Sequence, residues 1–209
     1  FGNAAQSAGC TLGRPDHCAP KDLRVAVLGN GSMGAAIVQA LVVVGFSVSV
    51  ACRRPPKEPV DGVVYFTGDS AISKAVEGME VVINTLPLTI ENKNVLNADL
   101  FGRRASGAWL IQIGRGEHLV ESDLIDALES GQLSGATLDV FRTEPLPSDH
   151  AFWSDPRLRL TPHLASDTPP RLVSEQVLQS AQQLRTGTVP DLTVDRAHGY
   201  YSGYALSDL

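Results

Sequence analysis

Short apolar segments alternate with amphipathic segments along most of this chain. Seven apolar segments of five to eight residues have the length of buried strands, at residues 23–29, 46–52, 62–66, 81–87, 107–114, 134–141 and 157–163. Strands with nearly continuous apolar runs are typical of parallel sheets whose two faces are both covered. Because helical segments separate these runs, the sequence predicts an α/β fold with helices on both faces of a parallel sheet.

The amphipathic segments predict the covering helices. Residues 35–44 place apolar side chains on one face, and Gly45 ends this helix because glycine adopts left-handed backbone angles at little cost. Ser122 is expected to cap a helix over residues 123–130, which ends at Gly131.

A longer helix is predicted near the end of the chain. Thr168 would cap it, Pro169 would stand in its first turn and Gly187 would end it. Its apolar residues recur at helical spacing and are expected to form one buried face: Leu172, Val173, Val177, Leu178, Ala181 and Leu184.

Composition and charge exclude several classes of function. The 209 residues carry a formal net charge of −6 and a sequence pI of about 5.3. An acidic chain without a basic stripe is poorly suited to nucleic acid or an anionic membrane, so we expect neither partner. The longest apolar run, residues 35–52, changes period and contains polar residues, which indicates a helix followed by a strand.

The few cysteines argue against a disulfide framework. Three are present, Cys10, Cys18 and Cys52, a low and odd number that fits a reducing compartment, and we expect a cytoplasmic protein. Cys10, His17 and Cys18 match none of the usual zinc spacings, so no metal site is predicted. Residues 1–20 have neither a basic start nor an apolar run, so no signal peptide is expected there.

The stretch GNGSMG contains the glycine spacing of dinucleotide-binding turns. Gly29 would permit the tight turn, Gly31 would let a pyrophosphate approach the backbone, and Gly34 would let the helix pack closely on the strand. Ser32 and Met33 would add the amide groups of the first helical turn. The turn follows a strand and opens a helix, which favours a Rossmann-type doubly wound sheet over a glycine-rich turn without a ligand.

The end of the second predicted strand indicates which dinucleotide is bound. NAD enzymes usually place an acidic residue there to bind the ribose hydroxyls, whereas this chain reads ACRRPPK and has no acid before Glu58. Guanidinium groups suit phosphate oxygens, so Arg53 and Arg54 favour NADP over NAD. The alternative is that both arginines are solvated loop charges.

Three downstream stretches carry a family resemblance. IGRGEHLVESDLIDAL, LDVFRTEPLP and PRLRLTPHLA, followed by VDRAHGY, occur in order on the expected elements. Together they resemble the D-isomer-specific 2-hydroxyacid dehydrogenase family, in its glyoxylate/hydroxypyruvate reductase branch, from about residue 24 to residue 200. The resemblance implies an enzyme that reduces a small 2-keto acid to the 2-hydroxy acid, and most such relatives are homodimers.

The same resemblance assigns three catalytic roles. Arg115 would hold the substrate carboxylate and polarise its carbonyl, His163 would protonate the forming alkoxide, and Glu144 would orient the His163 ring. Taken singly, each has a plainer explanation: a solvated turn arginine, a loop histidine and a strand-end glutamate. All three follow predicted strands at the sheet edge where α/β proteins bind ligands, which favours the catalytic interpretation.

Further cofactor contacts follow from the resemblance. Leu86 and Pro87 would run along the adenosine half, Ile113 and Gly114 would lie under the nicotinamide, and Asp139 would meet the nicotinamide end. Many relatives carry alanine at the position of Gly114, and we expect that exchange to matter little. Plainer alternatives are a strand-to-turn exit at residues 86–87 and a buried strand-end carboxylate at residue 139. Trp153 is expected to be a packing anchor.

The chain departs from the family pattern at its beginning. We expect an irregular arm or linker remnant over 1–22, a nucleotide-binding domain over 23–166, and a helix and tail over 167–209 that would return to a substrate domain. The family builds part of its substrate domain from the segment before the glycine turn, and residues 1–22 are too short to form it. The last helix would then lack its usual partner, and a second chain would cover its apolar face. The chain alone should bind cofactor better than it turns over substrate. A non-catalytic sensing module and a cofactor-binding fragment are the alternatives, and a phosphorylated 2-hydroxy acid is an alternative substrate.

Overall fold

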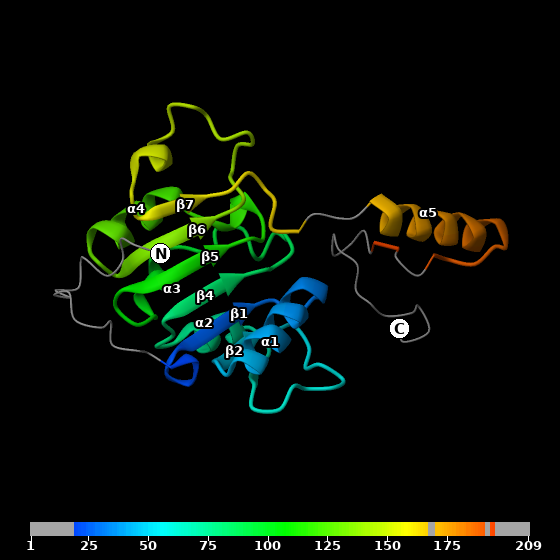
Figure 1. Cartoon of the computed structure of the whole chain (residues 1–209), viewed down its shortest axis with the longest axis horizontal. Coiled ribbons are helices and arrows are strands. Elements are labelled where there is room, and N and C mark those ends of the chain that lie inside the picture. The colour runs from blue at the N-terminus through cyan, green and yellow to red at the C-terminus, as the bar shows by residue number, and fades with distance from the viewer. Residues whose placement is uncertain (1–18, 167–169, 191–192, 195–209) are drawn as a thin grey trace.

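Seven strands form a single parallel sheet at the centre of the computed structural model, which describes residues 19–166, 170–190 and 193–194. Their order is β3-β2-β1-β4-β5-β6-β7 (Figure 1). The strands are β1 Arg24–Leu28, β2 Ser47–Ala51, β3 Val64–Phe66, β4 Val81–Asn84, β5 Ala108–Gln112, β6 Leu133–Leu138 and β7 Leu158–Leu160. All seven predicted strands are confirmed, and each is shorter than its predicted apolar segment.

Five α-helices lie in the described part of the chain. They are α1 Ser32–Val44, α2 Ala71–Val76, α3 Ala98–Gly102, α4 Glu121–Glu129 and α5 Pro170–Arg185. The described residues also form three short 3-10 turns: η1 Pro20–Asp22 precedes β1, while η2 Gly116–His118 and η3 Ala151–Ser154 lie in connections. The sequence pattern does not predict α2 or α3, because helices of five or six residues are too short for a clear period.

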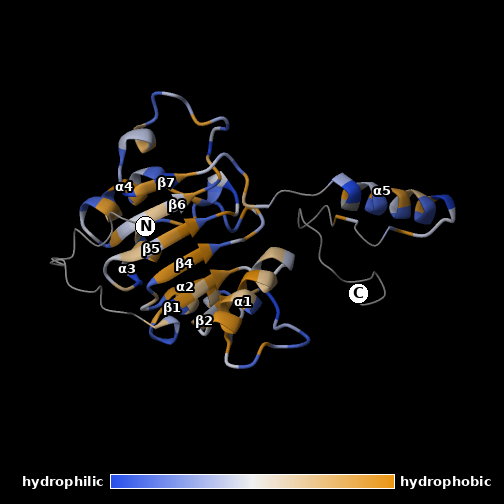
Figure 2. Ribbon diagram, viewed as in Figure 1, coloured by the Kyte–Doolittle hydropathy of each residue, from blue (hydrophilic) through white to orange (hydrophobic). Residues whose placement is uncertain are grey.

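The two faces of the sheet have separate cores. Ala26 and Leu28 of β1 belong to the core that includes buried residues of α2, α3 and α4. Val25 and Val27 point to the opposite face, where they pack with Val38 of α1. Figure 2 shows the strands and α1 mostly in apolar colours, while the loops are mostly polar. This arrangement confirms the predicted Rossmann-type doubly wound sheet.

The strand order places the functional end of the sheet. The chain runs from β1 outward through β2 and β3, and then returns to β4 on the other side of β1. Ligands of open α/β sheets bind at such a reversal, beyond the carboxyl ends of the strands. The loops after β1 and β4 therefore border the expected site.

The helix ends confirm one prediction and correct another. Gly45 caps α1 in the left-handed region with φ of 99°, as its residue type predicts. Ser122 is not the cap of α4, because the helix starts two residues earlier than predicted, at Glu121, and Val120 occupies the N-cap position without a side-chain hydrogen bond. The Ser122 hydroxyl donates to Asp123 instead.

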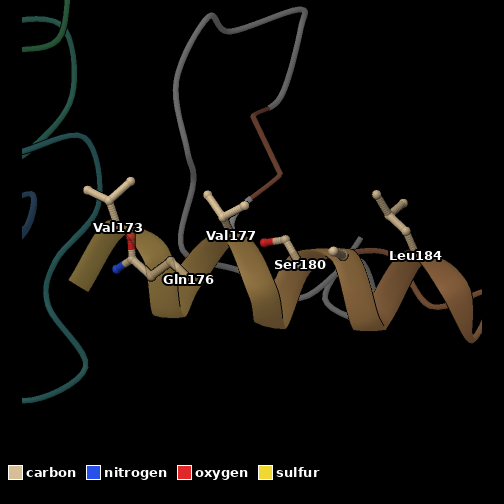
Figure 3. A pocket seen from close by; sticks show the side chains of 6 residues that line it. Val173, Gln176, Val177, Ser180 and Leu184 are labelled. Carbon is tan, nitrogen blue, oxygen red and sulfur yellow. The ribbon is translucent and has the colours of Figure 1, made fainter. Parts of the chain in front are cut away.

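The predicted buried face of α5 is exposed in this chain. Val173, Val177 and Leu184 are 42%, 60% and 65% exposed, and Leu178 and Ala181 are exposed as well. Figure 3 shows Val173, Val177 and Leu184 on one side of the helix, and α5 lies outside the layers of the sheet (Figure 1). The amphipathic pattern identified the helix correctly, but the sheet does not cover it. The predicted cap Thr168 and the following Pro169 lie outside the described residues.

Candidate active site

The glycine turn between β1 and α1 has the geometry that its three glycines require. Gly29 has φ of 102°, a conformation that other residues rarely adopt. A Cβ atom on Gly34 would lie 2.1 Å from the Gly29 carbonyl oxygen, so only glycine fits where the helix meets the turn. A Cβ on Gly31 would meet no atom within 4 Å, so this side of the turn is open.

The N-terminus of α1 fits a pyrophosphate group. Its N-cap is Gly31, which has no side chain. The backbone N–H groups of the first turn, which contains Ser32 and Met33, are therefore not capped by the N-cap residue. The first backbone N–H groups of a helix lack partners within the helix, and the helix dipole places partial positive charge there. The open space at Gly31 lets an anion reach these groups.

Thr85, which the sequence analysis did not identify, fastens this turn from the neighbouring strand. Its hydroxyl lies 2.9 Å from the Leu28 carbonyl oxygen and 3.3 Å from that of Gly29. A Cβ on Gly34 would also lie 2.9 Å from this hydroxyl oxygen. Thr85 follows β4 directly, so no spacing within the glycine motif could indicate it.

Arg53 and Arg54 follow the strand whose end contacts the glycine turn. Both arginines follow the carboxyl end of β2, whose last residue is Ala51. The carbonyl of Ala51 accepts a hydrogen bond from the N–H of Gly29 at 2.9 Å, which joins this strand end to the turn. Both arginines are exposed. The loop therefore carries two cationic side chains at the strand end where a dinucleotide places its adenosine ribose.

Arg115 lies in a tightly packed loop after β5. A Cβ on the neighbouring Gly116 would lie 2.0 Å from the carbonyl oxygen of Phe141, so the loop presses on the segment that follows β6. The Arg115 side chain is exposed and donates to the carbonyl of Gly114 at 2.6 Å. Its positive charge contributes to lowering the pKa of Glu144. The guanidinium thus lies at the same sheet edge as that carboxylate.

Glu144 and His163 form a pair across the ends of β6 and β7. Nδ1 of His163 lies 2.8 Å from Oε2 of Glu144, while Oε1 of Glu144 accepts the Phe141 N–H at 2.9 Å. Burial raises the pKa of Glu144, but hydrogen bonds from His163 and Phe141 and the nearby positive charges outweigh it and lower the pKa overall. The carboxylate is therefore kept ionised and oriented toward the ring.

Asp139 holds the turn that carries His163. Its buried carboxylate accepts hydrogen bonds from the Thr161 hydroxyl and from the N–H groups of Leu164 and Ala165, at 2.8 and 2.9 Å for the two amides. The His163 N–H donates to the Asp139 carbonyl at 2.8 Å, and His163 has φ of 56°. These bonds hold the backbone in a conformation that costs free energy for a non-glycine residue. The nicotinamide contact of Asp139 stays a prediction.

Replacing Asp139 with asparagine should destabilise the protein and alter its pH dependence. Burial raises the Asp139 pKa, but the three hydrogen bonds and the nearby His163 outweigh it and lower the pKa. A lowered folded-state pKa contributes stability above the unfolded value, about 3.9, that is lost as pH falls. We expect the variant to lose about 2 kcal/mol at pH 7, roughly 4 to 8 °C in Tm, and to depend less on pH below about 4.

Thermal unfolding from pH 3 to 7 measures this effect. Exposed Asp149 provides the matched control, because its replacement by asparagine removes the same charge with no comparable set of donors facing it. Equal Tm losses in the Asp139→Asn and Asp149→Asn variants would contradict the assigned role.

A buried polar cluster lies beneath the loops after β4 and β5. Nδ2 of Asn84 lies 2.7 Å from Oε1 of Gln112 and 3.0 Å from Nδ1 of His118. A Cβ on Gly114 would lie 2.8 Å from Nδ2 of Asn84 and 2.9 Å from Nδ1 of His118. The expectation that alanine at Gly114 would matter little is therefore wrong for this chain, because the added carbon would displace two buried, hydrogen-bonded groups.

The remaining predicted cofactor contacts border the same edge. Leu86 is half-buried, and its N–H donates to Oδ1 of Asn84 at 3.2 Å, while Pro87 is exposed. Ile113 is half-buried next to the fully enclosed Gly114. Their positions after β4 and β5 agree with the predicted cofactor path, and their contacts with a cofactor stay predictions.

Trp153 and the expected absence of a metal site concern regions outside this edge. Trp153 is not a packing anchor: it is 57% exposed, and its neighbour Phe152, 2% exposed, fills that role. The indole N–H of Trp153 donates to the Pro147 carbonyl at 2.8 Å. Within residues 19–166, 170–190 and 193–194, no cluster of histidine, cysteine and acidic residues could hold a metal ion. Cys10, His17 and Cys18 lie outside that range.

None of the helices in the described part of the chain is both long enough and apolar enough to cross a membrane.

The fold and this edge of the sheet define a dinucleotide-binding domain of the dehydrogenase class. The model of one family, D-isomer specific 2-hydroxyacid dehydrogenase, NAD binding domain, matches residues 6–165. The chain belongs to this family, and the resemblance found in the sequence is confirmed.

Individual relatives agree with the family model. Glyoxylate/hydroxypyruvate reductase A of Serratia proteamaculans is 43% identical over 176 residues, which are 84% of this chain and 56% of that protein. A D-isomer specific 2-hydroxyacid dehydrogenase from Xanthobacter autotrophicus, crystallised with NADPH and MES, superposes with a TM-score of 0.85 at 36% identity, covering 94% of this chain and 80% of that one.

A second solved structure belongs to a named reductase. NADPH-dependent glyoxylate/hydroxypyruvate reductase from Sinorhizobium meliloti, in complex with NADP and sulfate, superposes with a TM-score of 0.82 at 29% identity. That match covers 94% of this chain and 62% of the reductase. The chain thus spans little more than half the length of the curated relatives that it matches.

Proposed function

We propose that this chain is the cofactor-binding and proton-donating part of an NADP-dependent reductase of small 2-keto acids, with glyoxylate and hydroxypyruvate as leading substrates. The observation that carries the proposal is the 2.8 Å pair of His163 and Glu144 at the sheet edge that also carries the glycine turn. Arg115 adds a cation to the same edge, close enough for its charge to act on Glu144. The relatives named as glyoxylate/hydroxypyruvate reductases support this choice of substrate.

Each protein group has a distinct task in the proposed reaction. A bound nicotinamide supplies the hydride that reduces the substrate carbonyl. Arg115 holds the substrate carboxylate and draws electron density toward the carbonyl oxygen. His163 donates a proton from Nε2 to the forming alkoxide, because Nδ1 is engaged with Glu144. Glu144 orients the ring by its contact with Nδ1, so that Nε2 can face the substrate.

The proposed cofactor is NADP. Arg53 and Arg54 extend from the strand end beside the glycine turn, where a 2′-phosphate would be bound. Guanidinium groups form charge-assisted hydrogen bonds with phosphate oxygens, which the ribose hydroxyls of NAD cannot match. The two structural relatives above contain NADPH or NADP, which supports the same choice.

Replacing Arg53 or Arg54 with alanine should weaken NADPH binding and spare NADH binding. We expect Kd for NADPH to rise about tenfold or more for each variant, equivalent to about 1.4 kcal/mol, while Kd for NADH changes less than about twofold. Titration of nucleotide fluorescence measures both values. Lys21→Ala is the matched control, because it removes an exposed positive charge before β1.

Two results would contradict the proposed coenzyme. One is a wild-type chain that binds NADH as tightly as NADPH. The other is an equal loss of both nucleotides in the arginine variants, since that would indicate a general change in the fold.

A second candidate function is a dinucleotide-binding module or fragment that does not turn over substrate. This candidate is favoured because the match to the reductase from Serratia covers only 56% of that enzyme. Much of the enzyme therefore has no counterpart in the chain. This module would bind NADPH and leave hydroxypyruvate unreduced. The proposal also includes homodimer formation, a cytoplasmic location and the division of the chain into three parts, residues 1–22, 23–166 and 167–209.

A further inference from the structure

His118 is a buried histidine outside the proposed proton-transfer pair. It ends the 3-10 turn after Arg115 and has no exposed surface. Its Nδ1 lies 3.2 Å from the backbone nitrogen of Arg115 and 3.0 Å from Nδ2 of Asn84. Burying a polar ring costs free energy unless its nitrogens are bonded, and these two contacts, both at Nδ1, offset part of that cost.

The two contacts fix the protonation of the ring. Both partners are N–H donors, so Nδ1 offers its lone pair and the proton of the neutral ring lies on Nε2. Burial lowers the pKa of His118 most strongly, with a smaller lowering by Arg115, while the Pro87 carbonyl and Glu117 act in the opposite direction. Nε2 has no hydrogen-bond partner in the described part of the chain.

The ring therefore joins two loops that the proposed function uses. On one side Asn84 accepts the Leu86 N–H at 3.2 Å, and Pro87 follows in the same loop. On the other side Arg115 is held from both directions, because its N–H points to His118 while its carbonyl accepts from Nε2 of Gln112 at 2.8 Å. Such a network fixes the loop backbone more firmly than solvent contacts would.

We propose that neutral His118 is a positioning residue that fixes the Arg115 peptide, and with it the direction of the guanidinium, relative to the loop that borders the cofactor. The inference rests on the proposed function, since it assigns Arg115 to the substrate carboxylate. His118 acts through Arg115 and does not touch the reacting atoms. A small rotation of the Arg115 backbone would misplace its side chain toward substrate.

Two substitutions separate this role from simple core packing. In His118→Asn the side-chain oxygen can take the place of Nδ1, so the Arg115 N–H keeps an acceptor. In His118→Gln the polar atoms lie farther out, near the position of Nε2, and that acceptor is lost. Both variants shorten or reshape a buried side chain, so a merely structural role predicts parallel losses in Tm and function.

Amide hydrogen exchange of Arg115 is the first readout. We expect exchange about tenfold faster in His118→Gln than in the wild type, and within about threefold of the wild type in His118→Asn. The second readout is the hydroxypyruvate KM with saturating NADPH, which should rise about tenfold in His118→Gln and less than threefold in His118→Asn. Kd for NADPH should change less than threefold in both.

Equal exchange rates in the two variants, or KM values that follow only their Tm values, would overturn the inference. A wild type that binds NADPH but leaves hydroxypyruvate unreduced would count against the proposed function instead. The exchange comparison would still decide in that case, because it reports on the Arg115 backbone without requiring turnover.

Discussion

Replacing His163 with alanine should lower kcat for hydroxypyruvate reduction by about 10² to 10⁴-fold, the usual contribution of a positioned general acid. The ring is held by Glu144 at 2.8 Å and the backbone of His163 by Asp139, whereas the other two histidines in the described part of the chain, His118 and His150, contact other groups. Hydroxypyruvate-dependent oxidation of NADPH, followed on protein of verified intact mass, measures the loss. Kd for NADPH should change less than about threefold, because the turn after β1 is left intact.

His150 provides the matched control for this experiment. It also pairs with a glutamate, Glu121, at 3.4 Å, and it packs edge-on against Phe152. His150→Ala should leave kcat within about twofold of the wild type, since it lies outside the proposed proton transfer. Retention of more than a tenth of wild-type kcat in His163→Ala would show that the proton comes from elsewhere.

Replacing Gly34 with alanine should have the second large effect, on stability. The new Cβ would lie 2.1 Å from the Gly29 carbonyl oxygen, and this backbone atom cannot move without reshaping the turn. Overpacking of this kind costs about 1 to 3 kcal/mol, and we expect the upper end, a fall in Tm of roughly 6 to 12 °C. NADPH binding should be lost together with the turn. Thermal unfolding and nucleotide titration measure the two effects.

Gly31→Ala is the control within the same turn. Its φ of −72° suits alanine and its Cβ would meet no protein atom within 4 Å, so Tm should stay within about 2 °C. The added methyl group would enter the open side of the turn, and Kd for NADPH should rise about tenfold. A Tm of Gly34→Ala equal to that of Gly31→Ala would contradict the close packing of Gly34 on the Gly29 carbonyl.

Local patterns were sufficient to predict the sheet and the glycine turn. Seven apolar runs gave seven strands, and the spacing of Gly29, Gly31 and Gly34 matched a turn whose backbone requires them. The pairing of Glu144 with His163 was anticipated from the family resemblance, and the structure brings the two side chains together. Their catalytic roles stay predictions.

The supporting contacts could not be predicted because they depend on strand register. Asn84 and Gln112 face each other only because β4 pairs with β5 in the register that aligns these two residues. His118 reaches them from a 3-10 turn, and nothing in its sequence neighbourhood distinguishes it from an exposed loop histidine. Amphipathic spacing likewise identified α5 without showing what covers its apolar side.

A crystal structure of the chain with NADPH tests the central claim most directly. We expect the pyrophosphate against the backbone of Gly31 at the start of α1, the 2′-phosphate within hydrogen-bond distance of Arg53 or Arg54, and the nicotinamide C4 facing His163. A nucleotide bound away from the glycine turn, or a nicotinamide directed away from His163, would contradict the account.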